Sequence, residues 1–299
     1  MNRFRMSPVR MVLSLLSISA VAVVVVPAVS HASSTTKYYV SLGDSYSVGY
    51  QPSPTPGGAT SGYTGYVAKK LKMQLENFGC GGATTASILN VKGCTTPFGP
   101  PAATDAVAYP TQTQIAAADA FIAAHSGQIG LITVSIGGND VTSCASASNP
   151  ITCVTTAENT IRTNVTALAG DLRSAAGAGV PIVGLTYPDV LLGAWVFPAF
   201  PASSANQSLA SESVTAFKDL INPTLKTAYA SASGSFVDVT AATGAYTPLT
   251  TMAKLSPYGK IPKAVVEVCK LTWFCQLGNI HANTKGYIDI GKLITHSLP

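Results

Sequence analysis

Short apolar segments alternate with longer segments of helical periodicity along most of the chain, and this alternation limits the folds that the chain can adopt. Buried parallel strands appear as apolar runs, and each needs a crossover connection, usually a helix, to reach the next strand. The pattern therefore predicts a mostly parallel sheet covered by helices on both faces. We expect strands at 37–43, 129–136, 180–185 and 235–239, loops at 51–62 and 94–110, and helices at 63–75, 112–124, 155–176, 209–230 with a bend near Pro223, and 284–295.

The first 32 residues have the composition of a secretory signal peptide. Three arginines come first, an apolar run extends from Met11 to Val29, and the small residue Ala32 closes the segment. A membrane anchor fits less well, because the longest unbroken apolar stretch, 20–29, is shorter than the ~20 residues of a membrane span. We expect cleavage after Ala32, which leaves residues 33–299 as one domain of a secreted protein, extracellular or associated with the cell envelope.

Composition and charge exclude two classes of protein. The chain is 47% hydrophobic and 10% charged, which is too apolar for a disordered protein and fits one compact core. After the leader, 15 basic and 13 acidic side chains remain, a net charge of +2. No stripe of Lys and Arg is left to neutralise phosphates, so we expect no nucleic-acid partner.

The six cysteines are expected to form three disulfides. All of them follow the leader, and an even number of cysteines in an exported chain favours disulfide bonds. They fall into three couples that are close in sequence, and short loops cost the least entropy to close. Metal ligation is disfavoured, because there is no C-x-x-C motif and histidines are few; we expect neither a metal nor an organic cofactor. The expected pairs are Cys80–Cys94, Cys144–Cys153 and Cys269–Cys275.

Motifs of several common reaction classes are missing from the sequence. It contains no G-x-S-x-G elbow, no H-E-x-x-H, no Walker A loop and no G-x-G-x-x-G after a strand. Four other short motifs do occur, and two of them directly follow predicted strands, at the edge where open parallel sheets bind ligands. They are Gly-Asp-Ser-Tyr at 43–46, Gly-Cys-Gly-Gly-Ala-Thr at 79–84, Gly-Gly-Asn-Asp at 137–140 and His-Ala-Asn-Thr at 281–284.

In this order and strand context, the four motifs resemble those of the SGNH hydrolase superfamily, the GDSL-type lipases and esterases, in particular its secreted actinobacterial members. The resemblance covers most of the mature chain and implies a three-layer α/β/α sandwich, the flavodoxin-like fold of that superfamily. It implies Ser45 as the nucleophile and His281 as the general base. It assigns the oxyanion hole to the N–H groups of Ser45 and Gly82, with Gly81 as the weaker register, and to the Asn139 amide. Secreted members often hold three sequential disulfides, which agrees with the pairing above.

The chemistry of these residue types agrees with that assignment. A serine hydroxyl is a poor nucleophile until a base removes its proton, and histidine is the base suited to neutral pH. The mature chain has three histidines. His125 is expected at a solvated helix end and His296 in a frayed C-terminus, which leaves His281 as the candidate base.

The sequence departs from the superfamily pattern at three positions. Tyr46 replaces the usual Leu, and Ala282 replaces the usual Pro; we expect both exchanges to have little effect. Gly278 stands three residues before the His, where an Asp is usual, and the residue after it is an Asn. A carboxylate there would hold the imidazole in its productive tautomer. We therefore expect a Ser45–His281 dyad, or a triad completed by a main-chain carbonyl such as that of Gly278.

These observations predict a secreted serine esterase or lipase that hydrolyses carboxylic esters, of acyl or lipid type, through an acyl-Ser45 intermediate. The apolar segment 191–200 either folds onto the core or forms a wall for an acyl chain. We expect small-molecule or lipid esters as partners, transient contact with a lipid surface, and a monomer. The alternative is an envelope-associated protein that keeps the fold and binds acyl ligands without catalysis, because the usual acid near His281 is missing.

Overall fold

The computed structural model describes residues 1, 36–52, 62–94, 103 and 106–298. The leader expected at 1–32 lies outside the described residues, except for Met1. Most of the loop expected at 51–62 and part of the loop expected at 94–110 lie outside them as well. From residue 36 onward the described residues belong to one compact unit, and the following paragraphs concern this unit.

Within the described residues, five parallel strands are hydrogen-bonded in the order β2-β1-β3-β4-β5. All four expected strands are present, with ends within two residues of those predicted. The edge strand β2 was not predicted: the helix expected at 63–75 ends at Leu71, because Lys72 has a φ of 55° and so leaves the helical region. The strands are β1 (Tyr38–Gly43), β2 (Gln74–Asn77), β3 (Ile129–Ser135), β4 (Ile182–Leu185) and β5 (Ser235–Val237).

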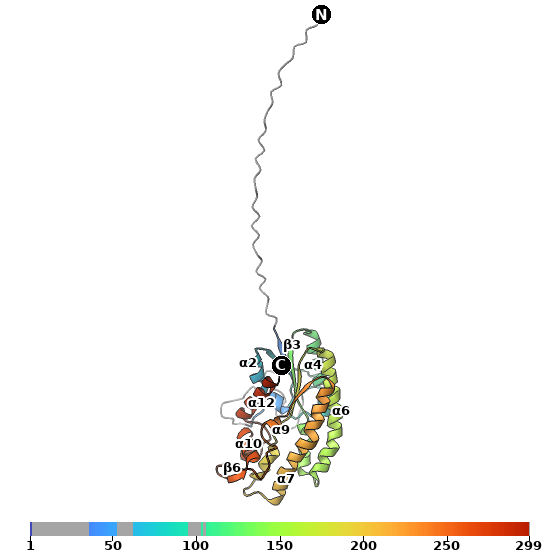
Figure 1. Cartoon of the computed structure of the whole chain (residues 1–299). Coiled ribbons are helices and arrows are strands. Elements are labelled where there is room, and N and C mark those ends of the chain that lie inside the picture. The colour runs from blue at the N-terminus through green and yellow to red at the C-terminus, as the bar shows by residue number, and fades with distance from the viewer. Residues whose placement is uncertain (2–35, 53–61, 95–102, 104–105, 299) are drawn as a thin grey trace. The chain divides into compact units, whose positions relative to one another are not determined.

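Helices cover both faces of the sheet, which confirms the three-layer α/β/α sandwich (Figure 1). Alternate residues of a strand point to opposite faces. In β3, Ile132 and Val134 therefore join one core cluster with α3, α4, α6 and α8, whereas Leu131 joins another with α2 and α12. These helices are α2 (Gly62–Leu71), α3 (Thr85–Asn90), α4 (Gln114–Ala124), α6 (Pro150–Ala176), α8 (Asn222–Ser231) and α12 (Thr284–Ser297).

A third apolar cluster lies apart from the two faces of the sheet. Leu192 and Val196 are buried in it together with residues of a hairpin and of the helix that follows the hairpin. The sequence did not predict these elements, whose strands are short and have no strictly alternating pattern. They are η2 (Val190–Trp195), β6 (Met252–Leu255), β7 (Gly259–Pro262), α10 (Lys263–Leu271) and α11 (Phe274–Leu277).

The helix expected at 209–230 is longer than predicted. It does not break at Pro223, because the turns that precede this residue form a π-helix. It begins at α7 (Ser204–Thr215), continues as the π-helix η3 (Ala216–Ile221) and ends as α8. The N–H of Asn222 reaches back five residues to the carbonyl of Phe217. Proline has no N–H to donate and its ring crowds the preceding turn, and a π-turn provides the extra room.

Four short helices directly follow strands or other helices at the edge where the parallel strands end. They are α1 (Ser45–Val48), α5 (Gly138–Val141), η1 (Thr142–Ser146) and α9 (Val239–Ala242). The six cysteines form Cys80–Cys94, Cys144–Cys153 and Cys269–Cys275, the pairs expected from their spacing.

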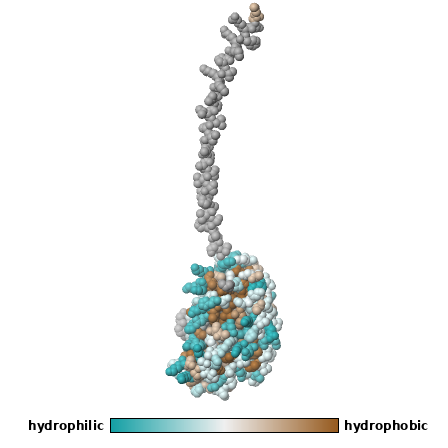
Figure 2. All heavy atoms as spheres, viewed as in Figure 1, coloured by the Kyte–Doolittle hydropathy of each residue, from teal (hydrophilic) through white to brown (hydrophobic). Residues whose placement is uncertain are grey.

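On the face shown in Figure 2, hydrophobic residues gather near the middle among hydrophilic ones. Among the described residues, no helix has both the length and the apolar character needed to cross a bilayer.

Candidate active site

The candidate site lies where β1 ends. Gly43, its last residue, has a φ of 135°, and a Cβ there would lie 2.1 Å from the carbonyl oxygen of Ser135 at the end of β3. Only glycine fits so close an approach. Asp44 then caps α1 by accepting a hydrogen bond from the N–H of Tyr46 at 2.9 Å. Ser45 is the first residue of α1, so its own N–H has no partner within that helix.

Ser45 and His281, 236 positions apart in sequence, are in direct contact. The Oγ of Ser45 lies 2.7 Å from Nε2 of His281, and the two residues are only 7% and 8% exposed. His281 belongs to the loop between α11 and α12. Asn283 fixes the end of this loop by accepting a hydrogen bond from the N–H of Gly286 at the start of α12.

Asn279 holds the other side of the imidazole. Its Oδ1 lies 2.8 Å from Nδ1 of His281 and also accepts the backbone N–H of His281 at 3.1 Å. A backbone N–H only donates, so the atom that faces the ring is the carbonyl oxygen. Nδ1 therefore carries the proton, and Nε2 is left to accept the hydrogen of Ser45 Oγ. The expected acceptor, the main-chain carbonyl of Gly278, does not fill this role.

The loop geometry explains why the acceptor comes from residue 279. Gly278 ends α11 with a φ of 62°, a left-handed conformation that side chains rarely adopt. A Cβ at this position would lie 2.5 Å from the ring of Phe197. An Asp at 278 would be strained and crowded, and Asn279 supplies a side-chain oxygen instead. An Asn that bonds the backbone two residues on is a common local motif, and this was the available sequence signal.

Two tyrosines pack against His281. The ring of Tyr46 is nearly parallel to the imidazole, with centroids 5.8 Å apart, and its hydroxyl donates to the carbonyl of Ile280 at 2.7 Å. The ring of Tyr50 meets the imidazole edge-on at 4.5 Å. Tyr46, whose replacement of Leu was expected to have little effect, thus contacts both the imidazole and the backbone beside it.

Burial sets the charge state of the histidine. Removal from water disfavours the imidazolium and lowers the pKa of His281 to about 4. The acceptor at Nδ1 is a neutral amide, so it does not offset this effect with a negative charge. His281 is therefore uncharged at neutral pH, the state in which Nε2 can accept a proton.

Asn139 lies at the start of α5, after β3. Its amide group is directed at Ala83 and at Asp44, the residue before α1. Its Nδ2 donates to the carbonyl of Ala83 at 2.9 Å and lies 3.5 Å from Oδ2 of Asp44. The first bond orients the amide. The second contact is long and weak, so this N–H can donate to a new acceptor instead at small cost.

Asp44, the residue before Ser45, has a buried carboxyl group. It accepts a hydrogen bond from the hydroxyl of Tyr187 at 2.6 Å. Burial raises the pKa of Asp44 to about 7, although the Tyr187 hydrogen bond acts in the opposite direction. Tyr187 also accepts the N–H of Gly138 at 3.3 Å. This network joins the start of α1 to the start of α5, and its Tyr187 member carried no motif in the sequence.

Gly82 lies in a turn after β2. The N–H of Cys80 donates to the carbonyl of Gly43 at 2.9 Å, and the N–H of Ala83 donates to the carbonyl of Cys80 at 3.1 Å. Gly82 is exposed with a φ of 78°, whereas Gly81 is buried. The turn is thus hydrogen-bonded to the other two segments of the predicted oxyanion hole. Cys80 bonds to Gly43 beside Ser45, and Ala83 bonds to Asn139.

Asp140 supports this arrangement from beside Asn139. Its carboxylate accepts the N–H of Thr85 at 2.9 Å and the hydroxyl of Thr85 at 2.6 Å. These bonds tie α5 to the start of α3. The sequence offered the Asn-Asp pair, but the partner at Thr85 is evident only in the folded chain.

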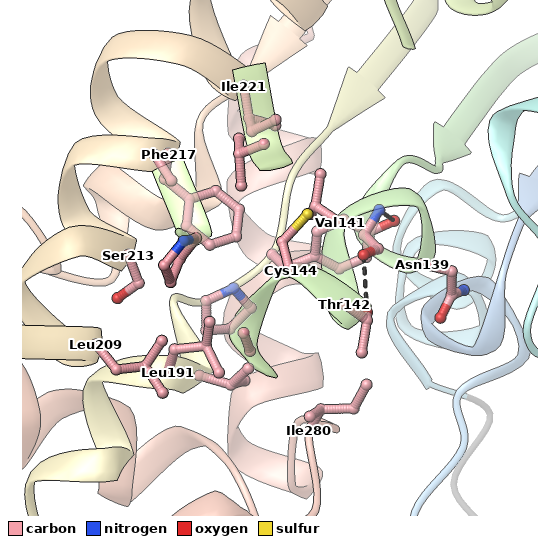
Figure 3. Close-up of a pocket in the computed structure, with 18 of the residues that line it drawn as sticks. Asn139, Val141, Thr142, Cys144, Leu191, Leu209, Ser213, Phe217, Ile221 and Ile280 are labelled. Carbon is pink, nitrogen blue, oxygen red and sulfur yellow. Dashed lines mark hydrogen bonds between the residues drawn. The ribbon is translucent and has the colours of Figure 1, made fainter. Parts of the chain in front are cut away.

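A largely apolar cavity opens beside Ser45, with an empty volume of about 890 Å³ that includes the part open to solvent. Figure 3 shows Asn139 on one side of it and Leu209 and Ser213 on the other. Of the segment 191–200, Leu191 lines the cavity, whereas the residues from Leu192 to Val196 lie mostly in the third apolar cluster. Most of this segment therefore folds onto the core, as the first interpretation expected, and Leu191 borders the cavity beside Ser45.

A family model connects this geometry with known proteins. The model of the GDSL-like lipase/acylhydrolase family matches residues 41–287, which include Ser45, Asn139 and His281. The chain therefore belongs to the GDSL-like lipase/acylhydrolase family. No curated protein sequence is significantly similar to it.

Two solved structures are similar to this chain, and the first of them shares its fold. The extracellular lipase of Streptomyces rimosus is 19% identical, and the match has a TM-score of 0.52 and covers 88% of this chain and 100% of that chain. The phospholipase A1 of Streptomyces albidoflavus NA297 is 21% identical, with a TM-score of 0.44 and coverage of 69% of this chain and 81% of that chain.

Proposed function

We propose that this chain is a secreted serine esterase or lipase that hydrolyses carboxylic esters, with Ser45 as the nucleophile and His281 as the general base. The observation that supports this most directly is the 2.7 Å hydrogen bond between Ser45 Oγ and His281 Nε2, with Nδ1 held by Asn279 at 2.8 Å. A nucleophile, a base and a group that orients the base, in series, form the arrangement that activates a serine.

The reaction follows from this geometry in two halves. His281 Nε2 takes the proton of Ser45 as Oγ attacks the ester carbonyl carbon, and the carbonyl oxygen becomes an oxyanion. The N–H groups of Ser45 and Gly82 and the amide of Asn139 are the proposed donors to it. The intermediate collapses, and the alcohol leaves with the proton from Nε2. Water then attacks acyl-Ser45 with the same base, which releases the carboxylic acid and restores the hydroxyl.

Export of the protein is part of the proposal. A basic start, an apolar middle and a small residue at position 32 support a cleaved leader at 1–32, and three disulfides are typical of exported chains. Transient contact with a lipid surface is supported by Phe200, Met252 and Leu277, large apolar side chains that are 45–56% exposed.

A fluorophosphonate probe tests the proposed function. The probe phosphonylates an activated serine, and peptide mass spectrometry locates it. We expect the adduct on Ser45 of the folded protein and none after heat denaturation. A folded protein that binds acyl ligands but leaves Ser45 unlabelled would instead support the non-catalytic alternative.

Replacement of Asn279 tests how the base is oriented. Asn279→Leu leaves the buried Nδ1–H without a partner, a cost of ~1–3 kcal/mol, so kcat/KM at pH 7 is expected to fall roughly 5- to 150-fold. Asn279→Asp keeps an acceptor and adds a negative charge, which favours the imidazolium. The variant should therefore recover most of the activity that Asn279→Leu loses.

The pH profile of kcat/KM tests whether residue 279 acts on His281 only by orienting its imidazole or also by changing its charge. The pKa of His281 is lowered to about 4, so the drop in the wild-type profile that this base causes should fall near pH 4, well below a step near pH 7 from Asp44. In Asn279→Asp, the carboxylate raises the pKa of His281, so this drop should move to higher pH. Superimposable acid limbs for the two proteins would show that residue 279 does not act on the base.

A further inference from the structure

We propose that Tyr187 is a positioning residue for Asn139, because its hydroxyl keeps the Asn139 amide available to the oxyanion that forms beside Ser45. The inference rests on the proposed function, since it takes Asn139 as an oxyanion donor. It goes further in that it assigns a role to a residue outside the four motifs, which follows β4 rather than β1, β2 or β3.

The hydroxyl of Tyr187 contacts both groups that border the Asn139 amide. It accepts the N–H of Gly138, the residue bonded to Asn139, at 3.3 Å. It also donates to Oδ2 of Asp44 at 2.6 Å, and this is the same oxygen that lies 3.5 Å from Nδ2 of Asn139. One hydroxyl therefore touches the backbone that carries Asn139 and the carboxyl that faces its amide.

Tyr187 is itself held in a fixed position. It is buried, and its carbonyl accepts the hydroxyl of Thr240 at 2.8 Å. Its ring meets the ring of Tyr46 edge-on, with centroids 4.8 Å apart. A Cβ on Gly138 would lie 3.0 Å from the Tyr187 ring, so the ring packs directly against the start of α5. These contacts fix the place of the hydroxyl.

The Tyr187 hydroxyl removes a competitor for the Asn139 amide. One hydrogen of Asn139 Nδ2 is bonded to the carbonyl of Ala83 at 2.9 Å, and the other can go to Asp44 Oδ2 or to the oxyanion. A buried carboxylate oxygen is a strong acceptor. Because Tyr187 occupies this oxygen at 2.6 Å, the contact with Asn139 stays long. Without the hydroxyl, Oδ2 would draw the hydrogen away from the oxyanion.

The first test is a double-mutant cycle with Asn139→Ala, in which kcat and KM are measured for p-nitrophenyl butyrate at pH 9. This pH lies above the pKa of Asp44, which burial raises to about 7 and which loss of the Tyr187 hydrogen bond would raise further. Tyr187→Phe should lower kcat about tenfold or more. KM should change less than about threefold, since the lost interaction belongs to the transition state.

In the Asn139→Ala protein the amide is already missing, so Tyr187→Phe should lower kcat by less than a further threefold or so. A tenfold loss in both backgrounds would overturn the proposal, because Tyr187 would then act by a route that does not include Asn139. A rise in KM with unchanged kcat would also overturn it, because Tyr187 would then contact the substrate itself.

A second cycle, with Asp44→Asn, removes the competing acceptor. The N–H of Tyr46 donates to Oδ1 of Asp44, so the carbonyl oxygen of the new amide stays there and its NH₂ group takes the place of Oδ2. No acceptor then faces Asn139 from this side chain. Tyr187→Phe should therefore lower kcat less than about threefold in the Asp44→Asn protein. A tenfold loss in this background as well would contradict the proposed competition.

Tyr39→Phe is the matched control for Tyr187→Phe. Tyr39 is also buried, and its hydroxyl lies 2.7 Å from Oγ1 of Thr133, within the sheet. The two variants lose the same kind of group, so both should lower Tm slightly, but Tyr39→Phe should keep kcat within about threefold of the wild type. An equal loss of kcat in both variants would show that Tyr187 supports only the fold.

The same measurements separate this inference from the proposed function. If the wild type hydrolyses the ester and Asn139→Ala lowers kcat by about 10²–10³-fold, but the effects of the cycles are additive, only the role of Tyr187 is overturned. If the wild type is inactive or Asn139→Ala has no effect, the oxyanion donor itself is misassigned and both proposals are overturned.

Discussion

Ser45→Ala is expected to lower kcat for p-nitrophenyl esters by about 10⁴-fold or more, because the methyl group can neither attack the carbonyl nor form the acyl intermediate. Binding and the proposed oxyanion donors remain, so a small residual rate above that in water is expected. Steady-state hydrolysis of a short ester measures the effect.

The matched control for this variant is Ser47→Ala. Ser47 lies in the same helix and is also buried, but its hydroxyl donates to the carbonyl of Asp44 at 2.7 Å rather than to His281. We expect it to change kcat less than about tenfold, the size of one lost hydrogen bond. Equal loss in both serine variants, or retained turnover in Ser45→Ala, would contradict the assignment of Ser45.

His281→Ala is expected to lower kcat/KM by about 10²–10⁴-fold at pH 7, the usual contribution of general base catalysis. Hydroxide can deprotonate the serine in its place, so the deficit should shrink as the pH rises. The measurement is a comparison of kcat/KM at neutral and alkaline pH for the variant and the wild type.

His125→Ala is the control for His281→Ala. His125 ends α4, with its ring against Tyr38 and Phe121 and its Nδ1 at 2.9 Å from the Phe121 carbonyl, so it takes no part in the proposed chemistry. Its replacement should leave kcat/KM unchanged. A larger loss from His125→Ala than from His281→Ala would show that the base has been misassigned.

The central sheet was predictable because its inner strands are buried on both faces and appear as apolar runs with glycines at one end. The edge strand β2 escaped prediction because it has only four residues, Gln74–Asn77, of mixed polarity. The apolar periodicity predicts the start of α6 at 155, whereas the helix begins at Pro150 after the Asn149 cap. Asn followed by Pro is a recognised helix start, but the first turn carries no strong apolar periodicity.

The approach of the segments that contain Ser45, Gly82 and Asn139 was predictable, because these segments follow the neighbouring parallel strands β1, β2 and β3, whose ends meet at one edge of the sheet. The group that orients His281 was not. Its identity depends on the left-handed backbone of Gly278 and on the Phe197 ring packed against it, and Phe197 comes from a loop 81 positions earlier. The contact of Tyr46 with His281 likewise depends on the loop that contains Ile280, whose carbonyl accepts the Tyr46 hydroxyl. The sequence alone does not indicate that this loop lies beside α1.

The most direct test of the central claim is to capture the acyl-enzyme itself. Wild-type protein is mixed with an excess of p-nitrophenyl octanoate, quenched with acid within the first turnovers, and digested for peptide mass spectrometry. We predict an octanoyl group on the peptide that contains Ser45, formed together with a burst of p-nitrophenol and strongly reduced in His281→Ala. Steady turnover of the ester with no acyl group on Ser45 at any quench time would contradict the claim.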